Sequence, residues 1–240
     1  MHLKIYTDYN TLSAHTAELI NQYINQKPDA FICIASGHTP IGVFQHLKRA
    51  IEQNKVSLTR CTFLSLDEWL GIDPSDPGSC LSMLQRDCFK PLDLKAEQIH
   101  YFNIHAPNLH EECNRINKLI ADNGGLDIML VGVGTNGHIG MNEPGTPFNS
   151  VAHVSELAEE TKTVGQKYFK KATALSQGIT LGLSHLQEAR LPIVMANGSR
   201  KAAILAQALK GKPSEHIPVS IVHQIPQAWV MLDQEAASLL

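Results

Sequence analysis

Short apolar runs alternate with longer amphipathic stretches along the whole chain. Short runs bounded by turn residues predict β-strands, whereas apolar residues that recur every three to four positions predict helices. We therefore expect strands at 2–6, 30–35, 61–66, 126–132, 192–197 and 227–232. We expect helices at 9–25, 40–54, 80–90, 108–123, 157–170 and 199–209, the last with Ser199 as a candidate N-cap.

The alternation of strands and helices indicates the fold class. Three of the apolar runs, the second, fourth and fifth, are nearly continuous, as in strands that helices cover on both faces. We therefore expect an α/β fold with a mostly parallel open sheet flanked by helices on both faces. No repeat, low-complexity tract or charged run interrupts the chain, so we expect a single domain over 1–240. Segments 71–79 and 140–150 should be loops beyond the carboxyl ends of strands, where such sheets bind ligands.

Composition and charge exclude several classes of protein. A net charge of −3 and a pI near 6.4 give no basic field for nucleic acid or an anionic membrane surface, so we expect neither as a partner. The five cysteines are never spaced as Cys-x-x-Cys, which argues against a disulfide framework or zinc ribbon and favours a cytoplasmic protein. No apolar run approaches the roughly 20 residues of a membrane span, and the first residues do not resemble a signal peptide.

A candidate phosphate site lies where the second strand meets its helix. Residues 36–40 read Ser-Gly-His-Thr-Pro and lack the Walker pattern. Small hydroxyl residues and a glycine at a helix N-terminus expose backbone N–H groups and the positive end of the helix dipole, which together bind phosphate. The alternative is an ordinary capped turn. Lys201, at the start of another helix, is a second candidate ligand, with a solvated lysine as the alternative.

Two carboxylates, Asp67 and Glu68, end the third predicted strand. Adjacent acidic residues at this position are costly to bury unless they are hydrogen-bonded or functional. A carboxylate at the carboxyl end of a strand is well placed to act as a general base. The alternative is a solvated pair that starts the loop at Gly71.

The most informative segment, 127–144, contains Gly-x-Gly-x-x-Gly directly after a strand. That pattern is typical of dinucleotide binding only where a helix opens directly on the glycines. Gly140 and Pro144 interrupt any such helix within two turns, so we do not expect a nicotinamide cofactor.

The same glycines allow a tight backbone path that presents His138 and Glu143 to a cleft. An imidazole oriented by a carboxylate is an acid/base device that works near neutral pH. Two alternatives remain. Asp67 could join the pair in a zinc site, although no second histidine stands at metal-binding spacing, or the histidine could be structural.

Together, residues 36–40, the Leu-Asp-Glu-Trp at 66–69 and the long motif at 132–144 resemble the glucosamine-6-phosphate deaminase family in order and spacing. The resemblance runs from about residue 30 to the strand near 232. It implies a modified Rossmann-like fold of the deaminase/6-phosphogluconolactonase type and an enzyme that needs no cofactor or metal. The Pro-Gly-Ser-Cys at 77–80 and the Gly-Ile-Thr-Leu-Gly-Leu at 178–183 look most like the galactosamine-6-phosphate branch.

The resemblance also implies a mechanism and a set of site residues. His138, oriented by Glu143, would open the sugar ring, and Asp67 would move the C2 proton to C1 before ketose phosphate and ammonia are released. The catalytic set would be Asp67, Asn136, His138 and Glu143. The substrate would contact Ser36, Gly37, His38, Thr39, Gly137 and Lys201.

The chain departs from the family pattern at two places. Asn136 stands where some members carry an aspartate, so it can orient the histidine but cannot stabilise an imidazolium by charge, and we expect a shifted pH profile. Ser176 and Gln177 stand where the glucosamine branch has a phosphate-binding arginine, which would reassign the phosphate to Lys201 and His38.

Two rival functions remain. The first is a 6-phosphogluconolactonase, although Trp69 and the Asn-Glu-Pro at 142–144 point away from it. The second is a non-catalytic sugar-phosphate sensor, whose usual helix-turn-helix has no room in this chain. In every case the expected partner is a small phosphorylated sugar, and the protein is expected to be a monomer or a small homo-oligomer.

Overall fold

The computed structural model describes residues 1–240, and its centre is a seven-stranded sheet with the order β1-β10-β9-β6-β2-β3-β5. All neighbouring strands in this sheet are parallel. The strands are β1 (His2–Tyr6), β2 (Phe31–Ile34), β3 (Thr62–Ser65), β5 (Ile99–His100), β6 (Ile128–Gly132), β9 (Leu191–Ala196) and β10 (Trp229–Asp233). Parallel neighbours require crossover connections, and the helices supply most of them.

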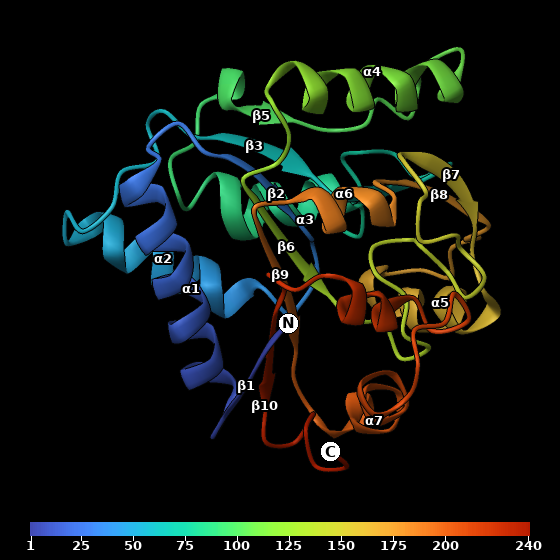
Figure 1. Cartoon of the computed structure of the whole chain (residues 1–240). Helices are drawn as coiled ribbons and strands as arrows, with labels where there is room; N and C mark the ends of the chain where they lie inside the picture. Colours follow the sequence, from blue (N-terminus) through green and yellow to red (C-terminus); the bar gives the residue numbers. More distant parts are fainter.

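Helices cover both faces of this sheet, with the blue helices on one side and the orange ones on the other (Figure 1). One face packs against α1 (Tyr9–Gln26), α2 (Ile41–Glu52) and a π-helical turn at Gln85–Phe89. The other packs against α4 (Leu109–Asp122), α6 (Leu183–Glu188), α7 (Ala202–Lys210) and a 3-10 stretch at Pro218–Gln224. In β2, Cys33 and Ile34 point into opposite cores, which explains its continuous apolar run. None of the helices has the length and apolar character needed to cross a bilayer.

A second, antiparallel sheet has the order β4-β8-β7 and comprises β4 (Asp67–Trp69), β8 (Gln177–Thr180) and β7 (His153–Glu156). Leu66 alone separates β3 of the large sheet from β4. Asp67 pairs with Thr180 in the antiparallel ladder. The second sheet therefore fixes Asp67 at the carboxyl edge of the first.

The strand order places a crevice between β2 and β6. These strands are neighbours, but from β2 the chain continues outward to β3 and β5, whereas from β6 it continues in the opposite direction to β9 and β10. At such a reversal the loops that follow two adjacent strands diverge to opposite faces of the sheet. The segments after β2 and β6 are the two glycine-containing motifs found in the sequence.

The predicted α/β fold is confirmed, and all six predicted strands are present within two residues of their expected bounds. The strands that were not predicted, β4, β5, β7 and β8, have only two to four residues each. The predicted helix at 80–90 is α3 (Cys80–Leu84) followed by the π-helical turn. The one predicted at 157–170 is shorter, with α5 (Glu159–Gly165) followed by a 3-10 turn at Gln166–Tyr168.

The prediction that Ser199 caps a helix is wrong. Ser199 is the first residue of a 3-10 turn, Ser199–Lys201, that precedes α7, and its side chain makes no capping hydrogen bond. The preceding Gly198 has a φ of 82°. Its N–H donates to both carboxylate oxygens of Asp233, at 3.0 and 3.1 Å. A carboxylate from β10 therefore fixes this turn.

A buried carboxylate, Asp127, ties the amino edge of the large sheet together. Asp127 is 1% exposed and accepts hydrogen bonds from Lys27 at 2.7 Å, Arg190 at 2.9 Å, the Tyr23 hydroxyl at 3.1 Å and the Phe31 N–H at 2.8 Å. Burial alone would raise the pKa of Asp127, but these partners hold it below its usual value. The group therefore stabilises the fold at neutral pH, and this contribution is lost as the pH falls through the lowered pKa.

We expect Asp127→Asn to lower the free energy of unfolding by about 3 kcal/mol, because it removes the charge from a buried and fully hydrogen-bonded ion-pair network. Urea unfolding at pH 7 measures this loss. Asp122→Asn, which breaks the exposed pair with Lys118, is the matched control and should cost less than about 0.5 kcal/mol. Equal effects of the two substitutions would contradict a special role for Asp127.

Candidate active site

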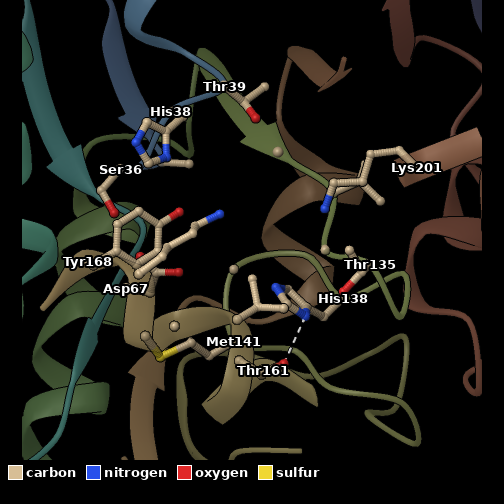
Figure 2. A pocket seen from close by; sticks show the side chains of 18 of the residues that line it. Ser36, His38, Thr39, Asp67, Thr135, His138, Met141, Thr161, Tyr168 and Lys201 are labelled. Carbon is tan, nitrogen blue, oxygen red and sulfur yellow. Dashed lines mark hydrogen bonds between the residues drawn. The ribbon is translucent and has the colours of Figure 1, made fainter. Parts of the chain in front are cut away.

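A cavity of about 450 Å³ opens at the carboxyl edge of the large sheet (Figure 2). This volume is in the range of small-molecule sites. Its walls come from the segments that follow β2, β3, β6 and β9, and from α5 with the turn after it. The three sequence motifs thus meet at one cavity. Of the two predicted loops, 140–150 contributes to the wall through Gly140 and Met141, whereas 71–79 does not reach it.

The turn between β2 and α2 forms one end of the cavity. Ser36, His38 and Thr39 line the wall, and the His38 ring stacks on Tyr168 with centroids 5.4 Å apart. The backbone N–H groups of residues 36–39 have no acceptor within the protein. Free N–H groups next to a helix N-terminus are donors for an anion.

Tyr9, at the start of α1, fixes the shape of this turn. Its hydroxyl accepts a hydrogen bond from the Gly42 N–H at 2.8 Å and contacts the Thr39 carbonyl at 3.0 Å. Gly37 has a φ of 86°, and a β-carbon there would lie 2.9 Å from the Tyr168 hydroxyl. Both conformation and space therefore favour glycine at position 37.

Three cationic side chains, Lys167, Arg200 and Lys201, line the cavity. Burial lowers the pKa of Lys201 to about 8, with a smaller contribution from the charge of Lys167. Burial and the charge of Arg200 likewise lower the pKa of Lys167. Cations that burial and mutual repulsion destabilise gain from a bound anion, so this region is suited to a phosphate.

Asp67 lines the cavity on the side of Ser36 and Tyr168 (Figure 2). Its side chain is part of the wall although the residue is only 8% exposed. Burial, reinforced by the charge of Glu68, raises the pKa of Asp67 to about 7, and a hydrogen bond with the Cys80 side chain opposes the shift. A carboxylate with a pKa near neutrality is a strong enough base to take a proton from carbon next to a carbonyl.

Glu68 has a structural role and does not line the cavity. Its carboxylate accepts hydrogen bonds from the N–H groups of Trp69, Cys80 and Leu81, each at 2.8 Å. It is 4% exposed, so the alternative of a solvated carboxylate pair is wrong. The contact joins β4 to the first turn of α3 and leaves Asp67 as the carboxylate that faces the cavity.

His138 faces Asp67 across the same cavity (Figure 2). Its Nδ1 lies 2.7 Å from the side-chain oxygen of Asn136, whose amide nitrogen donates to Glu143 at 2.9 Å. The Glu143 carboxylate is 3.7 Å from Nδ1, so Asn136 stands between the predicted pair. Burial lowers the pKa of His138 although the charge of Glu143 opposes the shift. The ring is therefore mostly neutral at pH 7.

The ring of His138 lies directly against the backbone of Gly134. A β-carbon at Gly134 would come within 2.2 to 2.5 Å of three ring atoms. The Gly134 N–H also donates to the His138 carbonyl at 2.9 Å. The second glycine of the Gly-x-Gly-x-x-Gly pattern therefore makes room for an imidazole and not for a pyrophosphate.

The structure brings most of the predicted site residues together, and those on the wall are Ser36, His38, Thr39, Asp67, His138 and Lys201. Asn136 and Glu143 lie behind His138. Gly37 and Gly137 do not line the cavity, and the α-carbon of Gly137 faces Ile204 and Ile217. No three His, Cys, Asp or Glu side chains are arranged to hold a metal ion, so the zinc alternative has no support.

Among the wall residues that sequence reasoning missed are Thr161, Lys167, Tyr168 and Arg200. The first three lie within the predicted helix at 157–170, and nothing in their spacing says which face would meet the cavity. Arg200 could have been found from its position next to Lys201. Ser176 and Gln177 are not on the wall, and Gln177 pairs instead with Glu156 of β7. Lys167, which does line the cavity, supplies a cation in addition to Lys201.

Comparison with known proteins shows the family of this chain. Residues 9–231 match the family model described as glucosamine-6-phosphate isomerases/6-phosphogluconolactonase. Among curated relatives, glucosamine-6-phosphate deaminase of Shouchella clausii is 36% identical over 100% of this chain and 96% of its own. The enzyme of the same name from Bacillus velezensis is 37% identical over 95% of each chain.

Solved structures indicate the same family. A monomeric glucosamine-6-phosphate deaminase superposes with a TM-score of 0.96 at 33% identity and full coverage of both chains. The 6-phosphogluconolactonase of Trypanosoma brucei has a TM-score of 0.79 at 18% identity, covers 100% of this chain and 98% of its own, and shares the fold alone. The chain therefore belongs to the glucosamine-6-phosphate isomerase/6-phosphogluconolactonase family.

Proposed function

We propose that the protein converts an amino-sugar 6-phosphate into a ketose 6-phosphate and ammonia. The observation that carries the proposal is the shared cavity, in which Asp67 and a neutral His138 face one space and anion-binding groups form another part of its wall. The relatives named above, which span nearly the whole chain, are glucosamine-6-phosphate deaminases. We therefore place glucosamine 6-phosphate first and galactosamine 6-phosphate second among the candidate substrates.

The first step opens the sugar ring. Asn136 and Thr161 both contact Nδ1 of His138, whereas Nε2 makes no hydrogen bond to the protein. Nε2 takes the proton from the anomeric hydroxyl and returns it to the ring oxygen, which gives the open-chain aldehyde. A ring nitrogen that is neutral at pH 7 is suited to both halves of this transfer.

The second step moves a proton along the carbon chain. The carbonyl at C1 acidifies the C2 proton, and the Asp67 carboxylate removes it while the C1 oxygen takes up a proton from the substrate's ammonium group, which gives an enolamine. Asp67 then delivers the proton to C1, and water hydrolyses the resulting imine to the ketose and ammonia. Atoms and electrons balance without a redox partner, so neither step requires an organic cofactor or a metal.

The phosphate binds at the end of the cavity that the turn at 36–39 and the cationic side chains form. Free N–H groups of the turn donate to phosphate oxygens, and Lys167 and Lys201 supply charge. Local groups therefore offset a net charge of −3 on the whole protein. We further propose that the protein acts as a cytoplasmic monomer, since its cysteines are all free and the structural relative with a TM-score of 0.96 is monomeric.

A substrate panel tests the proposed function. We expect the protein to release ammonia and ketose phosphate from glucosamine 6-phosphate, galactosamine 6-phosphate or both, and not from unphosphorylated glucosamine at equal concentration. Coupled assays follow ammonia and ketose, and a pH-stat follows acid release from 6-phosphogluconolactone. Acid release from the lactone alone would identify a lactonase, and binding without turnover would identify a sensor.

We expect Asp67→Asn to abolish exchange of the C2 proton and to lower kcat by on the order of 10²–10⁴, because the amide cannot take up the proton. NMR in deuterium oxide measures loss of the C2 proton and its replacement by deuterium. Asp73→Asn changes an exposed carboxylate outside the cavity and is the control. Exchange at the wild-type rate in Asp67→Asn would remove Asp67 from the role of base.

We expect a bell-shaped dependence of kcat/KM on pH. Its rising limb lies near pH 7, because Asp67 is protonated and inactive below its raised pKa of about 7. Its falling limb lies near pH 8, because Lys201 loses the charge that binds phosphate above its lowered pKa of about 8.

Lys201→Met should raise KM by about tenfold or more and remove the falling limb, whereas Lys210→Met at the other end of α7 should do neither. A falling limb that persists in Lys201→Met would assign it to another group.

A further inference from the structure

The Thr161 hydroxyl contacts the ring of His138 from α5, an element that none of the three sequence motifs includes. We propose that Thr161 is a positioning residue for His138, whose hydroxyl joins the Asn136 amide in holding Nδ1 and so stabilises the imidazolium that forms during ring opening. The proposal rests on the proposed function, since it assigns the group that supports His138 in that reaction. The Thr161 side chain is buried, and its hydroxyl lies 3.1 Å from Nδ1 (Figure 2).

The hydrogen bonds around Asn136 fix the proton on the ring. The Asn136 amide nitrogen donates to Glu143, which leaves the amide oxygen facing Nδ1 at 2.7 Å. The same oxygen accepts the backbone N–H of His138 at 3.1 Å. An amide oxygen can only accept, so Nδ1 carries the hydrogen in the neutral ring and Nε2 presents its lone pair to the substrate.

Thr161 matters because Asn136 has no charge. When Nε2 takes up a proton, the positive ring needs acceptors at Nδ1, and hydrogen bonds to a charged group are stronger than those between neutral groups. The Asn136 oxygen is one acceptor and the Thr161 hydroxyl oxygen is a second. The charges of Glu143 and Glu160 favour the imidazolium and that of Lys201 opposes it. Thr161 thus contributes by contact where a carboxylate at position 136 would contribute by charge.

The position of Thr161 also depends on the anion-binding end of the cavity. Thr161 belongs to α5, and the 3-10 turn that follows carries Lys167 and Tyr168. Both of these residues line the cavity, and Tyr168 stacks on His38 of the anion-binding turn. The element that holds Thr161 against the ring is therefore anchored where the phosphate would bind.

Histidine NMR on the substrate-free protein tests the proposal directly. With ¹⁵N-labelled histidine, and the His138 signals assigned by their loss in His138→Gln, we expect a ring protonated at Nδ1 in the wild type. Thr161→Val keeps the shape and removes the oxygen, so the pKa of His138 should fall by about one unit, a tenfold change in the protonation equilibrium. Thr161→Ser keeps the hydroxyl and should restore the wild-type value.

Kinetics supply a second and independent measurement. In Thr161→Val, kcat should fall by about tenfold with KM within about twofold, because the lost bond acts on the transferred proton and not on substrate binding. Thr161→Ser should recover most of this loss. The control is Thr163→Val on the same helix, where the hydroxyl bonds only to the Glu159 carbonyl and lies outside the cavity.

The outcomes separate clearly. If Thr161→Val and Thr163→Val give the same His138 pKa and the same kcat as the wild type, Thr161 only packs against the ring and the proposal is overturned. If Thr161→Val does not fold, Thr161→Ala removes the same oxygen and must show the same pKa shift. A wild-type protein that releases no ammonia would sink the proposed function, yet the NMR titration would still decide the role of Thr161.

Discussion

The hydrogen bonds that the Glu68 carboxylate accepts from the N–H groups of Trp69, Cys80 and Leu81 determine where Asp67 lies. They join the short strand β4 to the start of α3, which holds the neighbouring carboxylate inside a wall where water has little access. An unsatisfied second carboxylate at this depth would be too costly to bury. Because Glu68 is satisfied, its charge adds to burial in raising the pKa of Asp67. One carboxylate thus provides the structure and the electrostatic environment in which the other can be a base.

A second feature, the strand order of the large sheet, explains how an acidic protein accommodates an anion. The reversal of strand order between β2 and β6 opens one edge of the sheet, and the turns that follow these strands present free N–H groups and small residues to the cavity. Lys201 and Lys167, the latter beside the Tyr168 that stacks on His38, add positive charge to the same cavity. Since the cavity concentrates these cations, an anion meets local positive charge although the net charge of the protein is −3.

The sequence was sufficient for six of the seven strands of the large sheet, all but the two-residue β5, and for the groups that each motif carries. Runs such as 30–35 are apolar because both faces are covered, and this signal is local to the strand. The three-residue β4 has no such signal, because it pairs with residues of β8 that lie more than 100 positions away in the sequence. The polar β7 has no apolar run either. β8 lies close to β7 in sequence, yet its four residues are too few to show a period. Thr161 and Tyr168 were missed for a similar reason, since only the packing of α5 decides which of its side chains reach the cavity.

Strand β6 lies between a buried ion-pair network at one end and the cavity at the other. At its amino end Asp127 gathers a lysine, an arginine and a tyrosine into a buried network, and at its carboxyl end Gly132 borders the cavity. The network that anchors the fold and the groups that exchange protons with substrate therefore share no hydrogen bond. Substitutions at the amino edge can change the free energy of unfolding while the chemistry at the other edge stays intact. Stability and activity are therefore free to evolve separately.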